Sequence, residues 1–507
     1  MPTLADSLVE AARVTPHRVL LVDGDIRLDC ESLYQQAKVL AQALLSRMPA
    51  GGAVSFMLPN WYEAAVVYLA ATMAGIAVNP ILPSLRDREL SFILDDVDSG
   101  MIFIPREFRQ HDYLAMLERV TGQMDSPPEI VVLRGEHGDH TAFTTLLEHE
   151  SHANLPTLDS AAVRMILYTS GTTGRPKGVL HSHDSIHALI GQLRDHWLIE
   201  PGDRFLVPSP IAHIGGSIYA FECPLLLGTT AVLMDRWDPD EAVTLMVSRR
   251  CTHMAGATPF LEGLLAAAER TGTRLPDLKV FICGGASVSP SLIRRATAYF
   301  DHAVVTRVYG STEVPVTTVG SPTDPERAAD TDGRPGIATV KLVAHAAAPE
   351  GSGEMYARGP QMLVGYRNPE DDRDAFDDEG YFRTGDLAQW VDDDYLVVTG
   401  RAKDIIIRSG ENIAPKEIED ILTGHPDIRE IAIVGLPDAR TGERACAVIV
   451  PTVSCRPDVE SIRDFLVGYG VAKFKAPEQV VITESLPKND AGKVLKHQIR
   501  AELAKAE

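Results

Sequence analysis

The feature that most constrains the fold is a long alternation of two sequence patterns. Between residues 54 and about 396, short apolar runs rich in β-branched residues alternate with longer helical stretches, for example at 61–74 and 259–269. Several runs are continuously apolar, as expected of strands buried on both faces of a sheet. The alternation predicts an α/β fold. Strands are expected at residues 54–58, 101–104, 130–133, 165–168, 205–207, 231–234, 280–283 and 304–309.

A different pattern begins after Gly400. A helix at 415–423, strands at 431–434 and 445–450, and a helix at 459–467 predict an α+β unit. The 507 residues also exceed the roughly 100–200 of a typical domain. We therefore expect a large N-terminal domain of packed α/β subdomains at 1–399 and a smaller, mobile C-terminal α+β lid at 400–507. Two acidic stretches, 371–378 and 392–394, are expected to be solvated turns.

Composition restricts the partners and the compartment. The 70 acidic and 48 basic residues give a net charge of −22, which argues against nucleic acid or an anionic membrane as a partner. A polyphosphate substrate would therefore require positive potential to be concentrated locally. Six scattered cysteines without a CxxC pair indicate a reduced, cytoplasmic protein. The N-terminus predicts an amphipathic helix capped by Thr3 rather than a signal peptide, and no apolar run is long enough for integral membrane association.

The motif TSGTTGRPKG at residues 169–178 directly follows the expected strand 165–168. Its glycines let the backbone approach an anion closely, and successive N–H groups in such a loop form an anion-binding nest. A flexible linker is the alternative, but a linker rarely follows a buried strand directly. The GxxxxGK[ST] spacing of a Walker P-loop is absent, so ordinary P-loop phosphoryl transfer is disfavoured. The candidate phosphate-binding residues are Thr169, Ser170, Gly171, Thr172, Thr173, Gly174 and Lys177.

Further motifs follow in an order that is characteristic of one superfamily. They are YGSTE at 309–313, YFRTGDL at 381–387, GRAKD at 400–404 and PKNDAGKV at 487–494, with weaker matches at 208–216, 284–286 and 353–360. The ordered set resembles the adenylate-forming (AMP-binding) superfamily, and within it the acyl-CoA synthetase or fatty-acid–CoA ligase branch. The resemblance implies ATP, Mg²⁺ and coenzyme A as ligands. A carboxylic acid would be joined to AMP with loss of pyrophosphate, and the acyl group would then pass to the thiol.

The resemblance also implies roles for individual residues. Tyr309 is expected to stack on adenine, Thr312 to bind the α-phosphate and Glu313 to hold Mg²⁺. Asp386 and Arg401 are expected to bind the ribose. Taken alone, the same positions are typical of a core tyrosine, a solvated loop glutamate and an Asx-turn. The remaining nucleotide-binding candidates are Gly284, Gly285, Ala286, Gly310, Ser311 and Lys403, the last of which is also the expected hinge between the domains.

Lys493 is the strongest candidate for catalysis. It lies in the motif PKNDAGKV, which matches the loop of the superfamily's catalytic lysine. An unperturbed lysine, with a pKa of about 10.4, is cationic at neutral pH. Its ammonium can contact the attacking carboxylate and the α-phosphate together, and no general base is required because the nucleophile is already an anion. A solvated surface lysine is the alternative.

Histidines near these motifs have two interpretations each. In the superfamily, the position of His213 borders the acyl pocket, although a lone histidine is more often structural. His183 and His187 have the i, i+4 spacing of metal ligands, but no third ligand with suitable spacing is evident. His183 also matches a position just beyond the phosphate loop, so we expect a structural role for it rather than a metal site.

The sequence gives some indication of the acid. Acetate-activating relatives carry a tryptophan at the position of Gly310, so Gly310 together with Gly215, Gly216 and Ser217 indicates room for a larger acid. The expected wall also includes Ile214, Val314, Pro315 and Val316, and it offers no partner for the ammonium of an amino acid. We therefore expect a medium-chain, alicyclic or aromatic acid.

Coenzyme A is the expected thiol because no carrier domain follows the lid. Ser409 and Gly410 lie in a segment that resembles the thiol-facing loop of acyl-CoA ligases. Two alternatives remain: a stand-alone adenylating enzyme that loads a carrier protein, and a non-catalytic acyl- or nucleotide-binding protein. The oligomeric state stays open, with a homodimer as one alternative.

Overall fold

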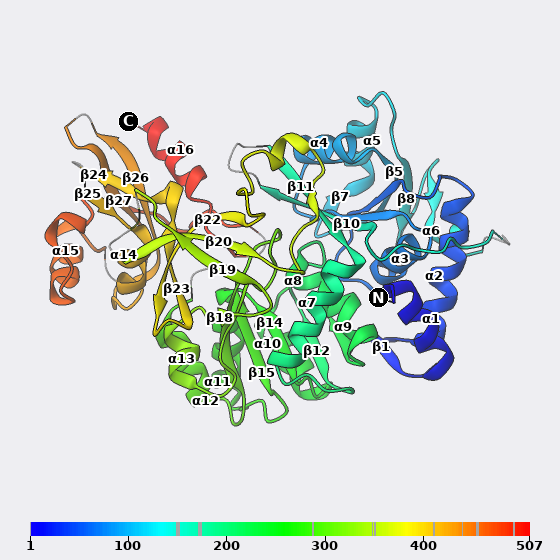
Figure 1. Cartoon of the computed structure of the whole chain (residues 1–507), viewed down its shortest axis with the longest axis horizontal. Coiled ribbons are helices and arrows are strands. Elements are labelled where there is room, and N and C mark those ends of the chain that lie inside the picture. The colour runs from blue at the N-terminus through cyan, green and yellow to red at the C-terminus, as the bar shows by residue number, and fades with distance from the viewer. Residues whose placement is uncertain are drawn as a thin grey trace.

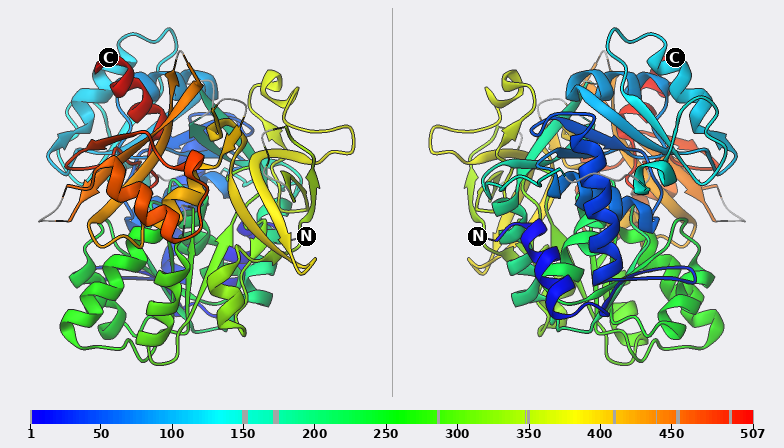
Figure 2. Two further views of the ribbon diagram at one scale, coloured as in Figure 1. Left: turned by 90° about the vertical axis from the view of Figure 1, so that its left-hand side faces the viewer. Right: turned by 90° about the vertical axis from the view of Figure 1, so that its right-hand side faces the viewer.

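A computed structural model describes most of the chain. It covers residues 2–148, 153–170, 175–285, 288–346, 348, 351–408, 411–438, 440–452, 456–489 and 492–506. The fold is mixed α/β, with a large N-terminal part and a small C-terminal part (Figure 1), as the sequence predicts. In the two side views of Figure 2, the C-terminal part, coloured orange and red, lies above the green helices of the large part.

Two large sheets form the N-terminal part, each with parallel strands at its centre and antiparallel strands at an edge. The eight-stranded sheet has the order β21 (Gly365–Tyr366), β11 (Pro176–Ser182), β10 (Val163–Ser170), β4 (Ala77–Pro80), β3 (Ala53–Phe56), β5 (Ser99–Pro105), β8 (Glu129–Leu133) and β9 (Thr141–Ala142). The nine-stranded sheet has the order β18 (Arg334–Pro335), β17 (Thr318–Val319), β16 (Val304–Tyr309), β15 (Val280–Gly284), β14 (His253–Gly256), β12 (Arg204–Val207), β13 (Thr230–Leu233), β1 (Val19–Asp23) and β2 (Ile26–Asp29).

Helices cover both sheets, and the largest apolar core joins residues of β3 and β10 to residues of β12 and β15. Every residue of α3 (Tyr62–Met73) except Tyr62 is buried, and its apolar residues from Ala64 to Met73 belong to this core. Other residues of the two sheets form two further cores with other helices. The other helices of this part are α1 (Leu4–Val14), α2 (Cys30–Leu45), α4 (Asp87–Val97), α5 (Tyr113–Thr121), α6 (Phe143–Leu147), α7 (His183–His196), α8 (Ile214–Ser217), α9 (Cys223–Leu226), α10 (Pro239–Ser248), α11 (Thr258–Thr271), α12 (Pro290–Tyr299) and α13 (Pro325–Asp330). A short hairpin is formed by β6 (Glu107–Phe108) and β7 (His111–Asp112).

A four-stranded antiparallel sheet precedes the C-terminal part. Its order is β19 (Thr339–Val343), β20 (Ser352–Arg358), β22 (Phe382–Val391) and β23 (Tyr395–Arg401). A 3₁₀ turn, Ala402–Asp404, then leads into a five-stranded sheet of β25 (Glu411–Ile413), β24 (Ile406–Arg408), β27 (Gly442–Pro451), β26 (Ile428–Asp438) and β28 (Gln479–Ile482). Helices α14 (Pro415–Leu422), α15 (Val459–Gly468) and α16 (Lys496–Ala506) belong to this C-terminal part.

The expected elements are confirmed, with boundaries that differ by a few residues. The strand expected at 304–309 is β16, and the helix expected at 61–74 is α3. Thr3 caps α1 as predicted, in a capping box with Asp6. The largest difference is at β26, which begins three residues before and ends four residues after the apolar run at 431–434, because backbone pairing with β27 continues beyond that run. In the described part of the chain, no helix combines the length and the apolar character needed to cross a membrane.

A buried ion pair fixes the short π-helical turn Ile218–Glu222, which follows α8. Oε1 of Glu222 accepts hydrogen bonds from Arg164 of β10 at 2.8 Å and from the hydroxyl of Tyr68 of α3 at 2.6 Å. The side chains of Arg164 and Glu222 are 3 % and 1 % exposed. Removing one partner would leave the other charge buried alone, which is strongly destabilising. The contact therefore holds the helical turn after His213 against β10, the strand that leads into the predicted phosphate loop.

Candidate active site

Three predicted nucleotide-binding residues meet where β16, β22 and β23 come together. Tyr309, the last residue of β16, donates its phenol hydrogen to Oδ2 of Asp386 at 2.6 Å. The other oxygen of Asp386 lies 2.8 Å from Nε of Arg401, its partner across β22 and β23. Burial and the Asp386 carboxylate raise the pKa of Tyr309 well above its usual value, so the phenol remains a donor. Each carboxylate oxygen of Asp386 keeps a second acceptor position, which suits two ribose hydroxyls.

Lys493 reaches the same place from the C-terminal part. It lies on a tight hairpin in which Lys488 pairs with Val494, and its backbone N–H donates to Oδ1 of Asn489 at 2.8 Å. Its side chain keeps contact with solvent and faces the charges of Arg401 and Asp386. Burial, and after it the charge of Arg401, lowers the pKa of Lys493 to about 8, below the value of about 10.4 for an unperturbed lysine. At pH 7 most of the ammonium is still cationic.

Positive charge is concentrated at this point, as a polyphosphate substrate would require in a chain of net charge −22. Lys403 lies near Arg401, and burial and the Arg401 charge lower the pKa of Lys403. Lys403 and Arg401 in turn lower the pKa of Lys493. The three side chains therefore repel one another, and a bound anion would relieve that repulsion.

The hairpin of Lys493 docks against the N-terminal part at α11. Gly492 has a φ of +78°, and a Cβ added there would lie 2.8 Å from Cγ of Pro259. Pro259 belongs to the first turn of α11, beyond the carboxyl end of β14. Glycine is required at this position both by the left-handed backbone and by the close approach to the proline ring.

The turn after Tyr309 presents Glu313 and is held from two directions. The hydroxyl of Tyr366 donates to Oε1 of Glu313 at 3.0 Å. Nε2 of His181 lies 2.8 Å from the backbone oxygen of Thr312. Burial lowers the pKa of His181 to about 4, so the imidazole is neutral and Nε2 carries the proton that it donates. Within the turn, Oγ of Ser311 accepts a hydrogen bond from the backbone of Val314 at 3.2 Å.

The phosphate loop is described on both sides of its centre. Thr169 and Ser170 end β10, and Thr169 pairs with Lys177 of β11. The candidates Gly171, Thr172, Thr173 and Gly174, and the side chain of Ser170, lie outside the described residues. Nζ of Lys177 lies 5.0 Å from the centre of the Tyr366 ring and 3.4 Å from Asp371.

The segment of His213 is fixed by a side chain that the motif analysis missed. Asn60 donates to the backbone oxygens of Val207 and Ser209 at 3.0 and 2.9 Å, and its Oδ1 accepts from the N–H of Ile211 at 3.1 Å. These bonds set the position at which α8 begins, directly after its N-cap residue His213. Asn60 lies about 150 residues before this segment and carries no motif, so the sequence contains no signal that would have identified it.

Comparison with known proteins identifies the family. The model of the AMP-binding enzyme family matches residues 8–367, and that of the AMP-binding enzyme C-terminal domain matches residues 417–493. This chain belongs to the AMP-binding enzyme family. The two models leave residues 368–416 between them, so the domain boundary at 399/400 stays a prediction.

Individual members of the family are similar over almost the whole chain. A medium-chain fatty-acid–CoA ligase of Escherichia coli is 34 % identical over 99 % of this chain and 90 % of the relative. The 3-[(3aS,4S,7aS)-7a-methyl-1,5-dioxo-octahydro-1H-inden-4-yl]propanoyl:CoA ligase of Rhodococcus jostii is 29 % identical over 99 % of this chain and 98 % of the relative. ATP-bound MatB of Rhodopseudomonas palustris superposes with a TM-score of 0.87, and its apo form with 0.75, each at 27 % identity over 99 % of both chains.

Mg²⁺ fits the residues of this AMP-binding enzyme in a specific way. Within the described ranges, no three or more His, Cys, Asp or Glu side chains are grouped so that they could hold a metal by themselves. Mg²⁺ is usually bound by one or two carboxylates together with substrate phosphates and water. Glu313, oriented by Tyr366, offers one such carboxylate. The site therefore suits a metal that arrives with the phosphates of ATP.

The glycines of the predicted site have two different roles. At Gly284, an added Cβ would lie 2.5 Å from the backbone oxygen of Val308, so this glycine allows β15 and β16 to approach; Gly285 has a φ of +81°. The expectation that Gly310 leaves open space is wrong, because a Cβ there would lie 2.5 Å from the backbone nitrogen of Val316. A side chain at this position would meet the backbone turn at 314–316. Ala286, Ser409 and Gly410 lie outside the described residues.

On the other wall of the expected acyl pocket, two glycines also differ. A Cβ at Gly215 would meet nothing within 4 Å, whereas one at Gly216 would lie 2.1 Å from the backbone oxygen of Pro210. Gly215 therefore faces open space beside His213, and Gly216 is required by packing. Ser217 is buried and directs its hydroxyl to the backbone oxygen of Ile214 at 3.3 Å.

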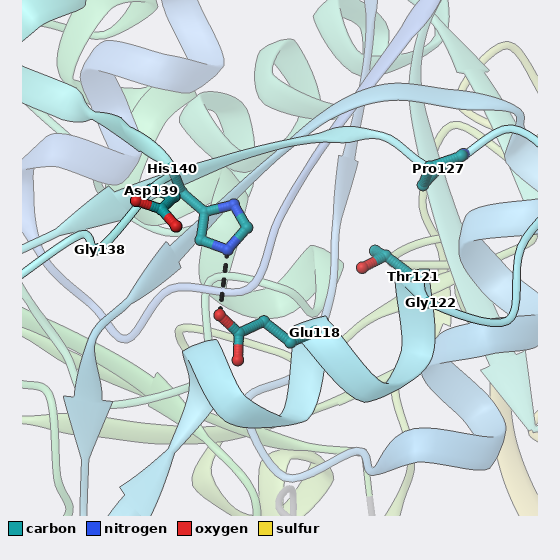
Figure 3. A pocket seen from close by; sticks show the side chains of 7 residues that line it. All are labelled: Glu118, Thr121, Gly122, Pro127, Gly138, Asp139 and His140. Atoms are coloured by element: carbon teal, nitrogen blue, oxygen red, sulfur yellow. Dashed lines mark hydrogen bonds and ion pairs between the residues drawn. The ribbon is translucent and has the colours of Figure 1, made fainter.

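A separate surface hollow of about 590 Å³ lies over the end of α5 and the loop before β9. The side chains of His140 and Glu118 point toward each other there (Figure 3), and Nε2 of His140 lies 3.2 Å from Oε1 of Glu118. The hollow is open to solvent and contains none of the predicted site residues. The hollow therefore gives no support to a second site, and Tyr309, Asp386, Arg401 and Lys493 remain the predicted site.

Proposed function

We propose that this AMP-forming acid–thiol ligase activates a medium-chain, alicyclic or aromatic acid at the convergence of Tyr309, Asp386, Arg401 and Lys493. The enzyme joins a carboxylic acid to coenzyme A at the expense of ATP. The observation that carries the proposal is that a hairpin from the C-terminal part brings Lys493 to Asp386 and Arg401. A nucleotide held by its ribose at Asp386 would have its α-phosphate within reach of this ammonium.

The first half-reaction needs charge and position more than proton transfer. A carboxylate oxygen of the acid forms a bond to the α-phosphorus while the bond from that phosphorus to the pyrophosphate oxygen breaks. The nucleophile is already an anion, so the chain has to reduce repulsion between two negatively charged reactants. Lys493 supplies a cation at that point and Lys177 supplies one toward the leaving group. Mg²⁺, when bound, neutralises phosphate charge, and Glu313 is the carboxylate that would hold it.

The proposed acid class rests on the wall around His213. Gly215 opens onto free space, and two other residues of the expected wall, Ile214 beside it in the chain and Val316, are apolar. An apolar wall offers no compensation for a buried ammonium, so an amino acid would lose its hydration without gaining a partner. The two CoA ligases compared above are named for a medium-chain fatty acid and for a fused bicyclic propanoate, which supports an apolar acid of this size.

The thiol step requires a second position of the C-terminal part. The described arrangement is closer to ATP-bound MatB than to apo MatB, with TM-scores of 0.87 and 0.75 at the same coverage. Both structures are of the same protein, MatB, so the difference between the two TM-scores reflects the conformation of MatB and not its sequence. We propose that the lid swings about residues 400–403 after adenylation, which removes Lys493 and brings Ser409 and Gly410 toward the thiol. A cytoplasmic location is part of the same proposal.

A pyrophosphate-release assay over a panel of acids tests the function. The panel contains acetate, hexanoate, octanoate, cyclohexanecarboxylate, benzoate and phenylalanine, each with MgATP and with or without coenzyme A. We expect release with the apolar acids and thioester formation only when coenzyme A is added. Preference for acetate or phenylalanine would refute the acid class. Acyl-adenylate that accumulates without reacting with coenzyme A would favour a carrier protein as the acceptor.

A further inference from the structure

Asp371 lies in an acidic stretch for which the sequence predicts solvated turns, and for this residue the prediction is wrong. The residue lies in a 3₁₀ turn, Pro369–Asp372, and its side chain is only 11 % exposed. One guanidinium nitrogen of Arg175 donates to both of its oxygens, at 3.0 and 2.9 Å. Nζ of Lys177 lies 3.4 Å from Oδ1. A single carboxylate thus binds both cations that follow the centre of the phosphate loop.

The segment that carries Asp371 is tied to the site at several points. Tyr366 pairs with Val179 of β11, and the N–H of Arg367 donates to the backbone oxygen of Gly178 at 2.7 Å. The hydroxyl of Tyr366 binds Glu313, and its backbone N–H donates to Asp372 at 3.0 Å. Because Tyr366 and Arg367 bond to β11 and Asp372 bonds to Tyr366, Asp371 is held in place beside Lys177.

The two cations are bound unequally. Arg175 holds both oxygens of Asp371 at hydrogen-bond distance, whereas Lys177 touches one of them at 3.4 Å, which is longer than a normal charge-assisted hydrogen bond. Arg175 therefore anchors the carboxylate, and the contact with Lys177 is the one that can exchange. Lys177 is also only 21 % exposed, so it has few alternative partners in water.

We propose that Asp371 is a positioning residue that competes with phosphate for Lys177 and thereby promotes the release of pyrophosphate. The inference rests on the proposed function, in which Lys177 binds the phosphates that leave. A half-buried lysine without a counter-charge would retain a polyanionic product. The Asp371 carboxylate, 3.4 Å from Lys177, weakens that binding and pairs with the lysine again when pyrophosphate departs. ATP binding is weakened by the same competition.

The test compares Asp371→Asn with Asp374→Asn, a matched change at an exposed aspartate of the same segment. Binding of magnesium pyrophosphate and of MgATP to the full chain is measured by calorimetry without acid. We expect Asp371→Asn to tighten both by about threefold to tenfold, the scale of a partly buried ion pair, and the gain to shrink as KCl is raised. Asp374→Asn should bind as the wild type does, and Asp371→Glu should restore the weaker binding.

Two further readouts separate positioning from a merely structural role. In a Lys177→Gln background, Asp371→Asn should have no effect, because its action passes through the lysine. In turnover, KM for ATP should fall together with kcat, since release of pyrophosphate slows. Weaker or unchanged binding by Asp371→Asn, or an equal gain without Lys177, would overturn the inference. Absence of MgATP binding by the wild type would instead refute the proposed function.

Discussion

Gly492 shows how closely the hairpin of Lys493 must approach α11. Its φ is +78°, and an added Cβ would lie 2.8 Å from Cγ of Pro259, where ordinary van der Waals contact begins at 3.4 Å. A proline ring cannot rotate away as a flexible side chain would. Gly492→Ala therefore introduces two costs. The backbone cost, about 1–2 kcal/mol, applies wherever the hairpin lies, but the clash exists only when it is docked on Pro259.

The clash should act on adenylation alone. Moving Lys493 by a fraction of an ångström to 1 Å lowers a rate that depends on position on the order of tenfold to hundredfold. We expect Gly492→Ala to lower kcat/KM for ATP by that factor in the pyrophosphate-release assay. Conversion of supplied acyl-adenylate and coenzyme A to thioester should stay close to the wild-type rate, because that step uses the other position of the lid.

Two control variants isolate the clash from the backbone cost. Gly470 has a φ of +80° and no atom within 4 Å of an added Cβ, so Gly470→Ala carries only the backbone cost. Pro259→Ala removes the ring atoms, and the Cβ that remains is 3.7 Å from the added methyl group. Adding Pro259→Ala to Gly492→Ala should therefore recover most of the adenylation rate. Equal slowing by Gly470→Ala, or no recovery in the double variant, would refute the reasoning.

Three further predictions follow from the same geometry. Lys493→Ala should lower the adenylation rate on the order of 10²–10³-fold and should still form thioester from supplied acyl-adenylate. In the wild type, kcat/KM for ATP should fall as the pH rises through about 8, where Lys493 loses its charge. Lys493→Arg should lack this alkaline decline. Ala402→Pro should lock the C-terminal part in the described position, because Arg401 before it has φ −107° and ψ 135°, which proline favours in a preceding residue. Pyrophosphate release should persist in the first turnover while the rate of thioester formation collapses. Lys403→Ala should lower the rate of thioester formation much less. Gly215→Leu should fill the open space beside His213 and shift kcat/KM from octanoate toward acetate, and an unchanged ratio would mean that Gly215 does not line the acyl pocket.

The sequence predicted the architecture because the burial of a helix or strand determines which of its positions are apolar. A strand covered on both faces is apolar at nearly every position, and β8 and β15 show such runs over 130–133 and 280–283, the expected places. The convergence of Tyr309, Asp386 and Arg401 was implied only by the resemblance. Two of these residues lie on neighbouring strands and the third ends a strand of another sheet, so no local pattern connects them.

Two errors have a common physical origin. The acidic stretch around Asp371 has the same composition whether its side chains are solvated or paired, and Asp371 turns inward because β21 adds to β11 and carries it to Lys177. A glycine likewise indicates only that a side chain is missing. Whether that side chain would have entered a cavity or met a backbone depends on the turn that folds over it, as Val314–Val316 folds over Gly310.

The pKa of Lys493 is a property that its motif cannot predict. A motif fixes the residue type, whereas the free energy of the charged form depends on the charges that surround it after folding. Arg401 and Lys403 precede Lys493 by about 90 residues, yet both lower its pKa, and Asp386 opposes them. The motif therefore predicts that the lysine is used, and the folded arrangement predicts the pH at which it stops working. Because a polyphosphate would offset the repulsion of these cations, nucleotide binding should raise the pKa of Lys493. The pH profile of kcat/KM reports the free enzyme and that of kcat reports the bound complex. The alkaline decline should therefore occur at a higher pH in kcat than in kcat/KM.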